Sequence, residues 1–403
     1  MTKRNENLAK LQAGYLFPEI NRRRLKFLQQ NPDARVISLG IGNTPEPLTP
    51  HVAEGLKNAA RELGTMEGYT GYGDEQGLTA LREKIAQVLY KGIIQPEEVF
   101  ISDGAKCDIG RFQLLFGPRS SIAVQDPSYP VYIDGSVLMG ATGLYNKEAQ
   151  RFDGVYYMPC LPANGFFPDL ASQPRTDLIY FCSPNNPTGA VATAAQLKEL
   201  VDFTRKNRSI LIFDAAYSEF IQDADLPRSI YEIDGARDCA IEINSFSKSI
   251  GFTGVRLGWS VVPNELRYED GGLVRDDWNR IVTTIFNGAS NLVQKAALAA
   301  LDPEGLRETK YLVGYYLENA RIIKEGLTAL GVTGYGGYNS PYIWAEFPGR
   351  KSWDIFEEIL NRAHIITTPG VGFGAAGESF LRFSAFGHRD NIREAVERLK
   401  KSL

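Results

Sequence analysis

The stretch SFSKSIGFTGVRLGW, residues 245–259, places a lysine between two serines and upstream of an arginine. The amine of Lys248 can form a covalent bond with an aldehyde, and the serine hydroxyls and Arg256 can bind an anion. Apolar runs precede and follow the stretch, so it connects two predicted strands. The pattern predicts an anion site with an amine at its centre, and a solvated lysine in a polar loop is the alternative.

Three further stretches contain residues that could contribute to the same site. Ser102–Lys106 places a glycine at the predicted start of a helix, where free backbone N–H groups and the helix dipole favour an anion. Asp214 ends an apolar run, and a carboxylate buried there needs a cationic partner. Asn186 lies in the turn Cys182–Gly189. Each stretch alone also has an ordinary explanation: a helix cap for Asp103 or Asp214, and a simple turn for Asn186.

The alternation of apolar runs and helical stretches between about residues 95 and 262 predicts a mainly parallel sheet covered on both faces. Because ligands bind outside the carboxyl ends of the strands in such sheets, we expect the four stretches to meet there. The predicted strands are residues 99–101, 121–124, 178–181, 210–213, 240–243 and 257–262.

The pattern changes after about residue 290 and predicts a second, smaller α+β domain. A long helical stretch covers about 303–330, and short strands near 342–347 and 379–384 flank a helix at about 352–362. We expect three segments: an N-terminal arm that is part of the small domain (1–45), a large domain (46–290) and a C-terminal small domain (291–403).

Composition and charge argue against several classes of function. The chain of 403 residues is 43% hydrophobic and 23% charged, with a net charge of -4 and no basic stripe, so we expect no nucleic-acid partner. No apolar run could span a bilayer, and the first twenty residues carry no secretory signal. The cysteines form no CxxC pair and the histidines lack ligand spacing, so we expect no metal, no disulfide framework and a cytoplasmic protein.

One cofactor requires the whole set of groups. Pyridoxal 5′-phosphate has a phosphate, a ring nitrogen to be kept protonated, a phenolic oxygen and an aldehyde for a lysine. The ordered stretches NNPTG, DAAY, SFSK and GVRLGW resemble those of fold-type I pyridoxal-phosphate enzymes, specifically the aminotransferases. The resemblance covers nearly the whole chain. It implies an α/β fold with a mainly parallel central sheet in the large domain.

Within the aminotransferases, the chain most resembles the LL-diaminopimelate aminotransferases. Asn43 and the pair Ser249-Ile250 depart from the pattern, which has an aspartate and an aromatic-small pair there. The stretches that carry the resemblance are AGYLFPEI (13–20), LGIGNTPEPL (39–48), GYTGYGDEQG (68–77), SDGAKCDIGR (102–111), QDPSYPVY (125–132), CSPNNPTGA (182–190), INSFSKSIGFTGVRLGW (243–259) and LRFSAFG (381–387).

The resemblance implies a role for each cofactor-binding residue. Lys248 bonds to the cofactor aldehyde and, once substrate frees it, carries a proton between the substrate α-carbon and the cofactor. Asp214 faces the ring nitrogen and keeps it protonated, and Tyr129 stacks on the ring. The other implied cofactor contacts are Asn186 and Tyr217 at the phenolic oxygen, then Tyr72, Ala105, Lys106, Ser245, Ser247 and Arg256 at the phosphate, together with Asn287.

The same resemblance implies how the substrate is held. Arg382 binds the α-carboxylate, and Glu75 binds the ammonium group at the far end of diaminopimelate. Tyr15, Tyr72, Glu75 and Asn287 then come from the neighbouring subunit, which implies a homodimer with shared sites. The remaining substrate contacts are Tyr15, Gly42, Lys106, Tyr129, Asn186 and Asn287.

The predicted reaction is reversible amino transfer between LL-2,6-diaminopimelate and 2-oxoglutarate, with a product that cyclises to tetrahydrodipicolinate on the route to lysine. Three alternatives remain open. One is an aminotransferase for aromatic or aspartate-type amino acids, one is a β-lyase or decarboxylase with the same cofactor, and one is a ligand-sensing regulator without catalysis. Glu75 favours diaminopimelate as the substrate over the substrates of the other aminotransferases, because those substrates have no distal ammonium to neutralise.

Overall fold

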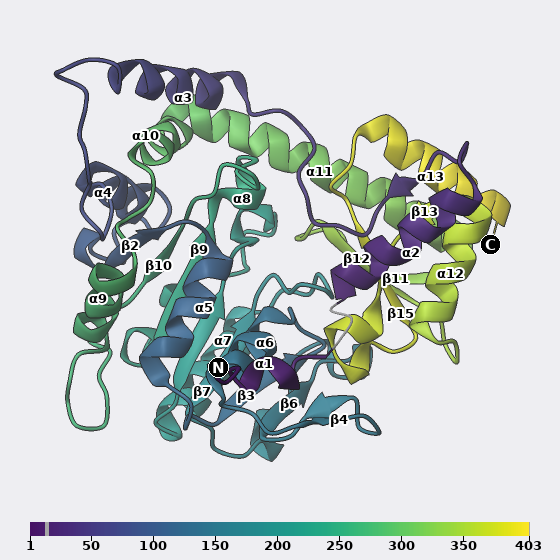
Figure 1. Cartoon of the computed structure of the whole chain (residues 1–403), viewed down its shortest axis with the longest axis horizontal. Coiled ribbons are helices and arrows are strands. Elements are labelled where there is room, and N and C mark those ends of the chain that lie inside the picture. Colours follow the sequence, from purple (N-terminus) through teal and green to yellow (C-terminus); the bar gives the residue numbers. More distant parts are fainter. Residues whose placement is uncertain (13–15, 403) are drawn as a thin grey trace.

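The computed structural model describes residues 1–12 and 16–402 and contains one large and one smaller main sheet (Figure 1). The large sheet has seven strands in the order β2-β10-β9-β8-β7-β3-β6. All neighbours from β9 to β6 are parallel, and β10 is antiparallel to both β9 and β2. This confirms the mainly parallel sheet. The strands are β2 (Val99–Ser102), β3 (Ile122–Asp126), β6 (Val155–Pro159), β7 (Leu178–Cys182), β8 (Ile210–Asp214), β9 (Ala240–Ser245) and β10 (Gly258–Val261).

The edge strand β6 is not among the strands that the sequence predicts. Its residues are a mixture of buried, half-buried and exposed positions, and Tyr156 is 44% exposed. A half-exposed edge strand lacks the continuous apolar run that marks the inner strands, so the sequence pattern does not reveal it.

Helices cover both faces of the large sheet, because successive strand residues point to opposite sides. On β8, Ile212 packs into one core while Leu211 and Phe213 pack into the other. The first core includes side chains of α5 (Ala105–Phe116), α6 (Val131–Met139) and α9 (Val274–Ile285). The second includes side chains of α4 (Thr79–Val88), α7 (Ala194–Lys206) and α10 (Asn291–Ala300).

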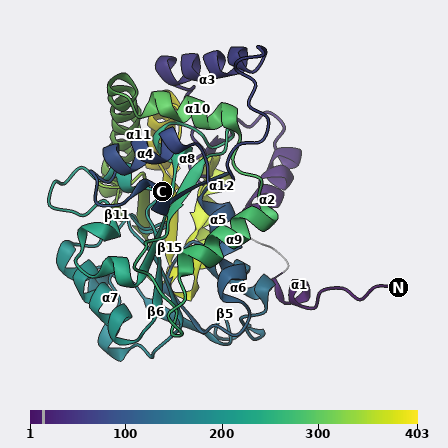
Figure 2. The ribbon, with the colours of Figure 1, turned by 90° about the vertical axis from the view of Figure 1, so that its left-hand side faces the viewer.

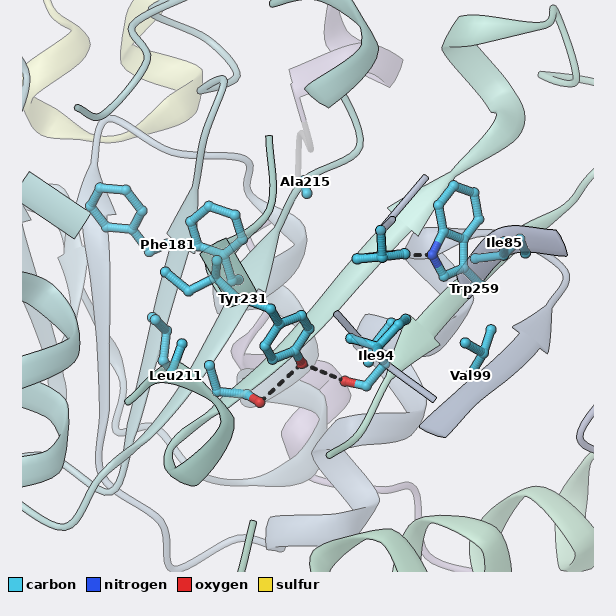
Figure 3. Packing of buried hydrophobic residues seen from close by; sticks show 14 of the residues in the cluster. Ile85, Ile94, Val99, Phe181, Leu211, Ala215, Tyr231 and Trp259 are labelled. Atoms are coloured by element: carbon cyan, nitrogen blue, oxygen red, sulfur yellow. Dashed lines mark hydrogen bonds between the residues drawn. The ribbon is translucent and has the colours of Figure 1, made fainter. Parts of the chain in front are cut away.

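Buried polar groups within the second core are hydrogen-bonded, as Figure 3 illustrates. The Tyr231 hydroxyl lies 3.1 Å from the Ala240 carbonyl oxygen and 2.9 Å from that of Val261. The Trp259 indole donates to the Tyr90 hydroxyl at 2.9 Å. These bonds fix β9 and β10, the two strands on either side of the Lys248 stretch, against the rest of the core.

The smaller sheet is antiparallel, with the order β11-β12-β15-β14. A separate parallel pair joins β1 (Ile37–Ser38) to β13 (Ile365–Ile366), so the beginning of the chain lies beside its last third. The smaller sheet and its helices are β11 (Thr333–Gly336), β12 (Tyr342–Glu346), β14 (Thr368–Pro369), β15 (Phe380–Ser384), α11 (Pro303–Ala329), α12 (Ser352–Ala363) and α13 (Arg389–Ser402). The expected domain boundaries at residues 45 and 290 stay a prediction.

The N-terminal helices lie apart from one another (Figure 2). The first residues extend away from the body of the molecule, α1 (Asn7–Lys10) packs beside α6, and α2 (Leu16–Gln30) packs into the core of the smaller sheet. Helix α3 (Pro50–Glu62) packs on α10. The short strands β4 (Tyr145–Asn146) and β5 (Arg151–Phe152) form a separate hairpin. Among the described residues, none of the helices combines the length and apolar character needed to cross a bilayer.

Candidate active site

A cavity of about 530 Å³ lies at the carboxyl ends of β7, β8 and β9. It gathers most of the residues that the sequence singles out, because these strands are parallel and end at the same edge of the sheet. The predicted site residues that line it are Gly42, Ala105, Lys106, Tyr129, Asn186, Asp214, Tyr217, Ser245, Ser247, Lys248, Arg256 and Arg382.

Lys248 lies in the single-turn helix α8 (Phe246–Ser249), directly after β9. The Ser245 hydroxyl accepts a hydrogen bond from the Ser247 backbone N–H at 3.0 Å and caps this turn. The Lys248 amine donates to the Gly42 carbonyl oxygen. Burial lowers the pKa of Lys248 to about 7, and the positive charges of Arg382 and Arg256 act in the same direction. A large fraction of the amine is therefore neutral, and so nucleophilic, at neutral pH.

Asp214 ends β8 with its carboxylate 5% exposed. The Tyr132 hydroxyl donates to Oδ2 at 2.7 Å, and the Ala216 backbone N–H donates to Oδ1 at 3.0 Å. Burial raises the pKa of Asp214, and these two hydrogen bonds oppose the rise. No lysine, arginine or histidine among the described residues forms an ion pair with this carboxylate, so the cation that a buried aspartate needs has to come from a ligand.

An anion cradle forms where α5 begins. Gly104 has a φ of 123°, and a Cβ at this position would collide with the Arg256 guanidinium. Arg256 also donates to the Ser247 hydroxyl at 3.1 Å. The alternative that Asp103 caps this helix is wrong, because Gly104 occupies the cap position and Asp103 accepts from Arg111 at 2.7 Å. The first residues of the helix, the two serines and Arg256 line the same cavity, and together they can bind an anion.

Arg382, on β15, reaches the cavity from the smaller sheet and is 1% exposed. Its guanidinium donates to Asn186 Oδ1 and to the Gly40 carbonyl oxygen, both at 2.6 Å. It lies between the rings of Tyr342, 4.4 Å from its centroid, and Phe373, 4.8 Å from its centroid. Its buried Nε has no hydrogen-bond partner within the described residues. A buried donor without a partner is costly, and an anionic ligand in the cavity could accept from it.

Sequence reasoning missed two tyrosines that support the site. Tyr132 holds Asp214, as described above, and its ring stacks on Tyr180 with centroids 5.3 Å apart. Tyr342 holds Tyr217 through a hydroxyl–hydroxyl bond of 2.7 Å. Tyr132 lies in the first turn of α6, three residues after Tyr129, which precedes the helix, and this closeness in sequence could have pointed to it. Nothing in the sequence around Tyr342 marks it, because its neighbours come from distant segments.

The residues expected to act across a dimer lie away from this cavity. Tyr72 is 87% exposed, Asn287 is exposed and Glu75 is half-buried, and none of them lines the cavity. Their two loops touch, since a Cβ at Gly288 would lie 3.4 Å from the Glu75 Cα. We call residues 66–77 and 285–291 together the loop surface. Tyr15 lies outside the described residues.

The described residues fit pyridoxal phosphate, the cofactor expected from the sequence. Asp214 lacks a cation and matches a protonated ring nitrogen, and the cradle at Gly104 and Arg256 matches a phosphate. Lys248 offers an amine of lowered pKa between these two points. Asn186 accepts from Arg382 through Oδ1, which leaves its amide N–H groups as donors for an oxygen in the cavity.

Comparison with known proteins identifies the family. The model of aminotransferase class I and II matches residues 34–399. The chain is 54% identical over 403 residues to "LL-diaminopimelate aminotransferase" of Protochlamydia amoebophila (strain UWE25), covering 100% of this chain and 98% of the relative. It is 56% identical over 399 residues to "LL-diaminopimelate aminotransferase, chloroplastic" of Arabidopsis thaliana, covering 99% of this chain and 86% of the relative.

A solved structure has nearly the same backbone. The L,L-diaminopimelate aminotransferase of Chlamydomonas reinhardtii superimposes with a TM-score of 0.96 and is 58% identical, with 99% of this chain and 98% of that chain covered. The agreement in fold and sequence extends over both sheets, and therefore over all elements that form the cavity.

Proposed function

The chain belongs to the class I and II aminotransferases, and on this premise we propose that it transfers an amino group between LL-2,6-diaminopimelate and 2-oxoglutarate. The choice of substrate rests on one observation: the chain is 54–57% identical, over 99–100% of its length, to relatives named LL-diaminopimelate aminotransferase. As a member of this family the chain is an enzyme that works with pyridoxal 5′-phosphate and small-molecule substrates. The reaction serves the diaminopimelate route to lysine.

When bound, the cofactor supplies an aldehyde for the amino group and a ring that withdraws electrons from the substrate α-carbon. In the proposal, Lys248 holds the aldehyde and, once released, moves the proton at the α-carbon. Asp214 keeps the ring nitrogen protonated, and Tyr132 holds Asp214 in place at 2.7 Å. The lowered pKa of Lys248 supports its choice as the base, because a base works best when its pKa lies near the operating pH.

The substrate is held at its two ends by different parts of the molecule. We assign the α-carboxylate to Arg382, whose Nε is a buried donor without a partner in the described chain. The distal ammonium is assigned to Glu75. Tyr15, Lys106, Asn287 and the Gly42 backbone are the proposed contacts of the distal carboxylate.

A homodimer is part of the proposal, since Glu75, Tyr72 and Asn287 belong to the exposed loop surface and would serve the partner's cavity. The exposure of Met66, Tyr69 and Tyr72, at 91%, 69% and 87%, supports a covered surface there. The free cysteines Cys107, Cys160, Cys182 and Cys239 agree with a reducing compartment, and we propose the cytoplasm.

The visible spectrum of the purified protein tests the proposal in two steps. Protein loaded with pyridoxal phosphate should be yellow, lose the colour when LL-diaminopimelate is added alone, and regain it with 2-oxoglutarate. A yellow protein that responds to glutamate and ignores LL-diaminopimelate would keep the cofactor and reject the donor. Release of carbon dioxide would indicate a decarboxylase, and release of free ammonia without consumption of 2-oxoglutarate would indicate a lyase.

A further inference from the structure

The loop that follows β14 connects the smaller sheet to the end of β3 in the large sheet. This loop contains the turns η7 (Gly370–Phe373) and η8 (Ala375–Gly377). Its Phe373 ring lies 4.8 Å from the Arg382 guanidinium. The Phe373 carbonyl oxygen accepts from the Ser128 backbone N–H at 2.8 Å. The ring of Phe373 thus contacts the guanidinium of Arg382, and the backbone of Phe373 is hydrogen-bonded to the segment that follows β3.

A second attachment holds the same loop, and it depends on a side chain. Asp126, the last residue of β3, is 6% exposed, and its Oδ1 accepts from the Ala376 backbone N–H at 3.2 Å. Gly374 approaches the same oxygen so closely that a Cβ there would collide with it. Among the described residues, no cation forms an ion pair with Asp126. Burying a carboxylate without a cation is costly, and its hydrogen bond to the Ala376 backbone offsets part of that cost.

The segment that begins with Asp126 also carries the cofactor face. Tyr129, three residues on, lines the cavity, and Tyr132 donates to Asp214. The segment 126–132 therefore touches both the proposed cofactor position and the loop beneath Arg382. The segment therefore couples the loop that contacts Arg382 to the wall of the cavity.

We propose that Asp126 is a positioning residue for the substrate α-carboxylate: it anchors the loop 370–377 so that Phe373 holds Arg382 at the correct distance from the cofactor. The inference rests on the proposed function, because it takes Arg382 as the carboxylate-binding group. The inference concerns only the α-carboxylate, which all amino-acid and oxo-acid substrates share. Asp126 acts through the loop and touches neither substrate nor cofactor.

The test compares Asp126→Ala, Asp126→Asn and Phe373→Leu in the cofactor-loaded enzyme. Alanine removes the acceptor for the Ala376 N–H, so KM should rise about tenfold for LL-diaminopimelate and for 2-oxoglutarate alike, with kcat changed less than about threefold. Phe373→Leu should do the same. Asparagine keeps an oxygen acceptor, and both KM values should stay within about threefold of the unaltered protein.

A matched control lies at the opposite end of β3. Asp177 accepts from the Ser121 backbone N–H and hydroxyl at 2.8 and 2.7 Å and has no contact with the loop. Asp177→Asn should lower the melting temperature without moving either KM. The absorbance of bound cofactor should be the same in all variants, because none of them alters a group that contacts the cofactor.

Three results would overturn the proposal. Asp126→Ala could leave both KM values unchanged, could raise KM for only one substrate, or could lower kcat and cofactor loading at constant KM. If Asp126→Ala does not fold, Asp126→Ser decides, since its hydroxyl is polar but too short to reach Ala376. An unaltered protein that turns over glutamate and rejects LL-diaminopimelate would instead refute the substrate, and the comparison of variants would then use the KM of glutamate and of 2-oxoglutarate.

Discussion

The cavity around Lys248 and the loop surface differ in how completely one chain builds them. In the cavity, Asp214, Arg382 and Lys248 are buried or half-buried and held by bonds from the same chain. On the loop surface, Tyr72 and Asn287 are exposed and line no part of that cavity. Burial raises the pKa of Asp214 and lowers that of Lys248, whereas Tyr72 and Asn287 are exposed to solvent.

The difference separates chemistry from substrate choice. Proton transfer needs groups of fixed geometry and shifted pKa, and a single folded core supplies them. In the proposed function, recognition of the far end of the substrate uses Glu75, which lies on the loop surface and would be brought in by a second copy. We infer that the reaction is encoded within one subunit and the substrate range between two.

Lys248→Ala gives the largest expected effect. Removing the amine eliminates both the covalent attachment and the proton carrier, so turnover should fall by ~10⁴-fold or more. The fold should persist, because the side chain contributes one hydrogen bond to the Gly42 carbonyl. Steady-state assays with LL-diaminopimelate and circular dichroism check the two statements. Lys198→Ala, at an exposed lysine paired with Asp202, is the control and should keep full activity.

The sequence predicts the inner part of the cavity well for a physical reason. Lys248, Asp214 and Asn186 each follow an apolar run, and parallel strands bring their carboxyl ends to one edge. Local patterns along the chain therefore contain the information needed to bring these residues together. Their individual roles stay predictions.

The parts that the sequence does not reveal depend on contacts between distant segments. Tyr342 meets Tyr217 across 125 positions, and Asp126 meets Ala376 across 250. No local spacing predicts such pairs, because they follow from how the two sheets lie against each other. The edge strand β6 was missed for a different reason, since exposed residues interrupt its apolar run.

Mixed dimers test directly whether Glu75 acts in the partner's cavity. Lys248→Ala and Glu75→Ala chains should each be nearly inactive with LL-diaminopimelate. In a mixed dimer, one cavity has both changes and the other has neither. Random association should therefore restore about a quarter of the unaltered activity, because half of the dimers are mixed and each has one intact site.

The control for this experiment pairs two changes within one cavity. Lys248→Ala and Arg382→Ala affect groups that line the same cavity of one chain. A mixed dimer of these two leaves every site with one defect, so no activity should return. Recovery in this pair, or none in the Glu75 pair, would contradict the division between the cavity and the loop surface.

Glu75→Gln should change the substrate range more than the reaction. The substitution removes the negative charge opposite the distal ammonium, and kcat/KM for LL-diaminopimelate should fall ~10–100-fold, the range for a charged hydrogen bond. Glutamate has no distal ammonium, so its kcat/KM should change less than about threefold. Glu67→Gln, at an exposed acid of the same loop, should affect neither substrate. Equal losses for both substrates would reject the proposed role of Glu75.

The pH dependence of cofactor capture gives the smallest effect and isolates the cavity from the loop surface. Only the neutral amine attacks an aldehyde, and the pKa of Lys248 is lowered to about 7 by burial and by Arg382 and Arg256. Below pH 7 the rate at which cofactor-free protein binds pyridoxal phosphate should rise about tenfold per pH unit, and above pH 7 it should level off. Stopped-flow absorbance measures this rate.

The pH at which the rate levels off, called the bend below, shows whether groups of the same chain alone set the pKa of Lys248. An ordinary lysine has a pKa near 10.4, so an amine exposed to solvent would give a rate that keeps rising to about pH 10. Arg382→Gln removes one positive charge and should move the bend to higher pH, because the protonated amine is then repelled less. Burial, Arg382 and Arg256 lower this pKa, so Glu75→Gln should leave the bend where it is. A bend that moves with Glu75 would mean that the second subunit also sets the reactivity of Lys248.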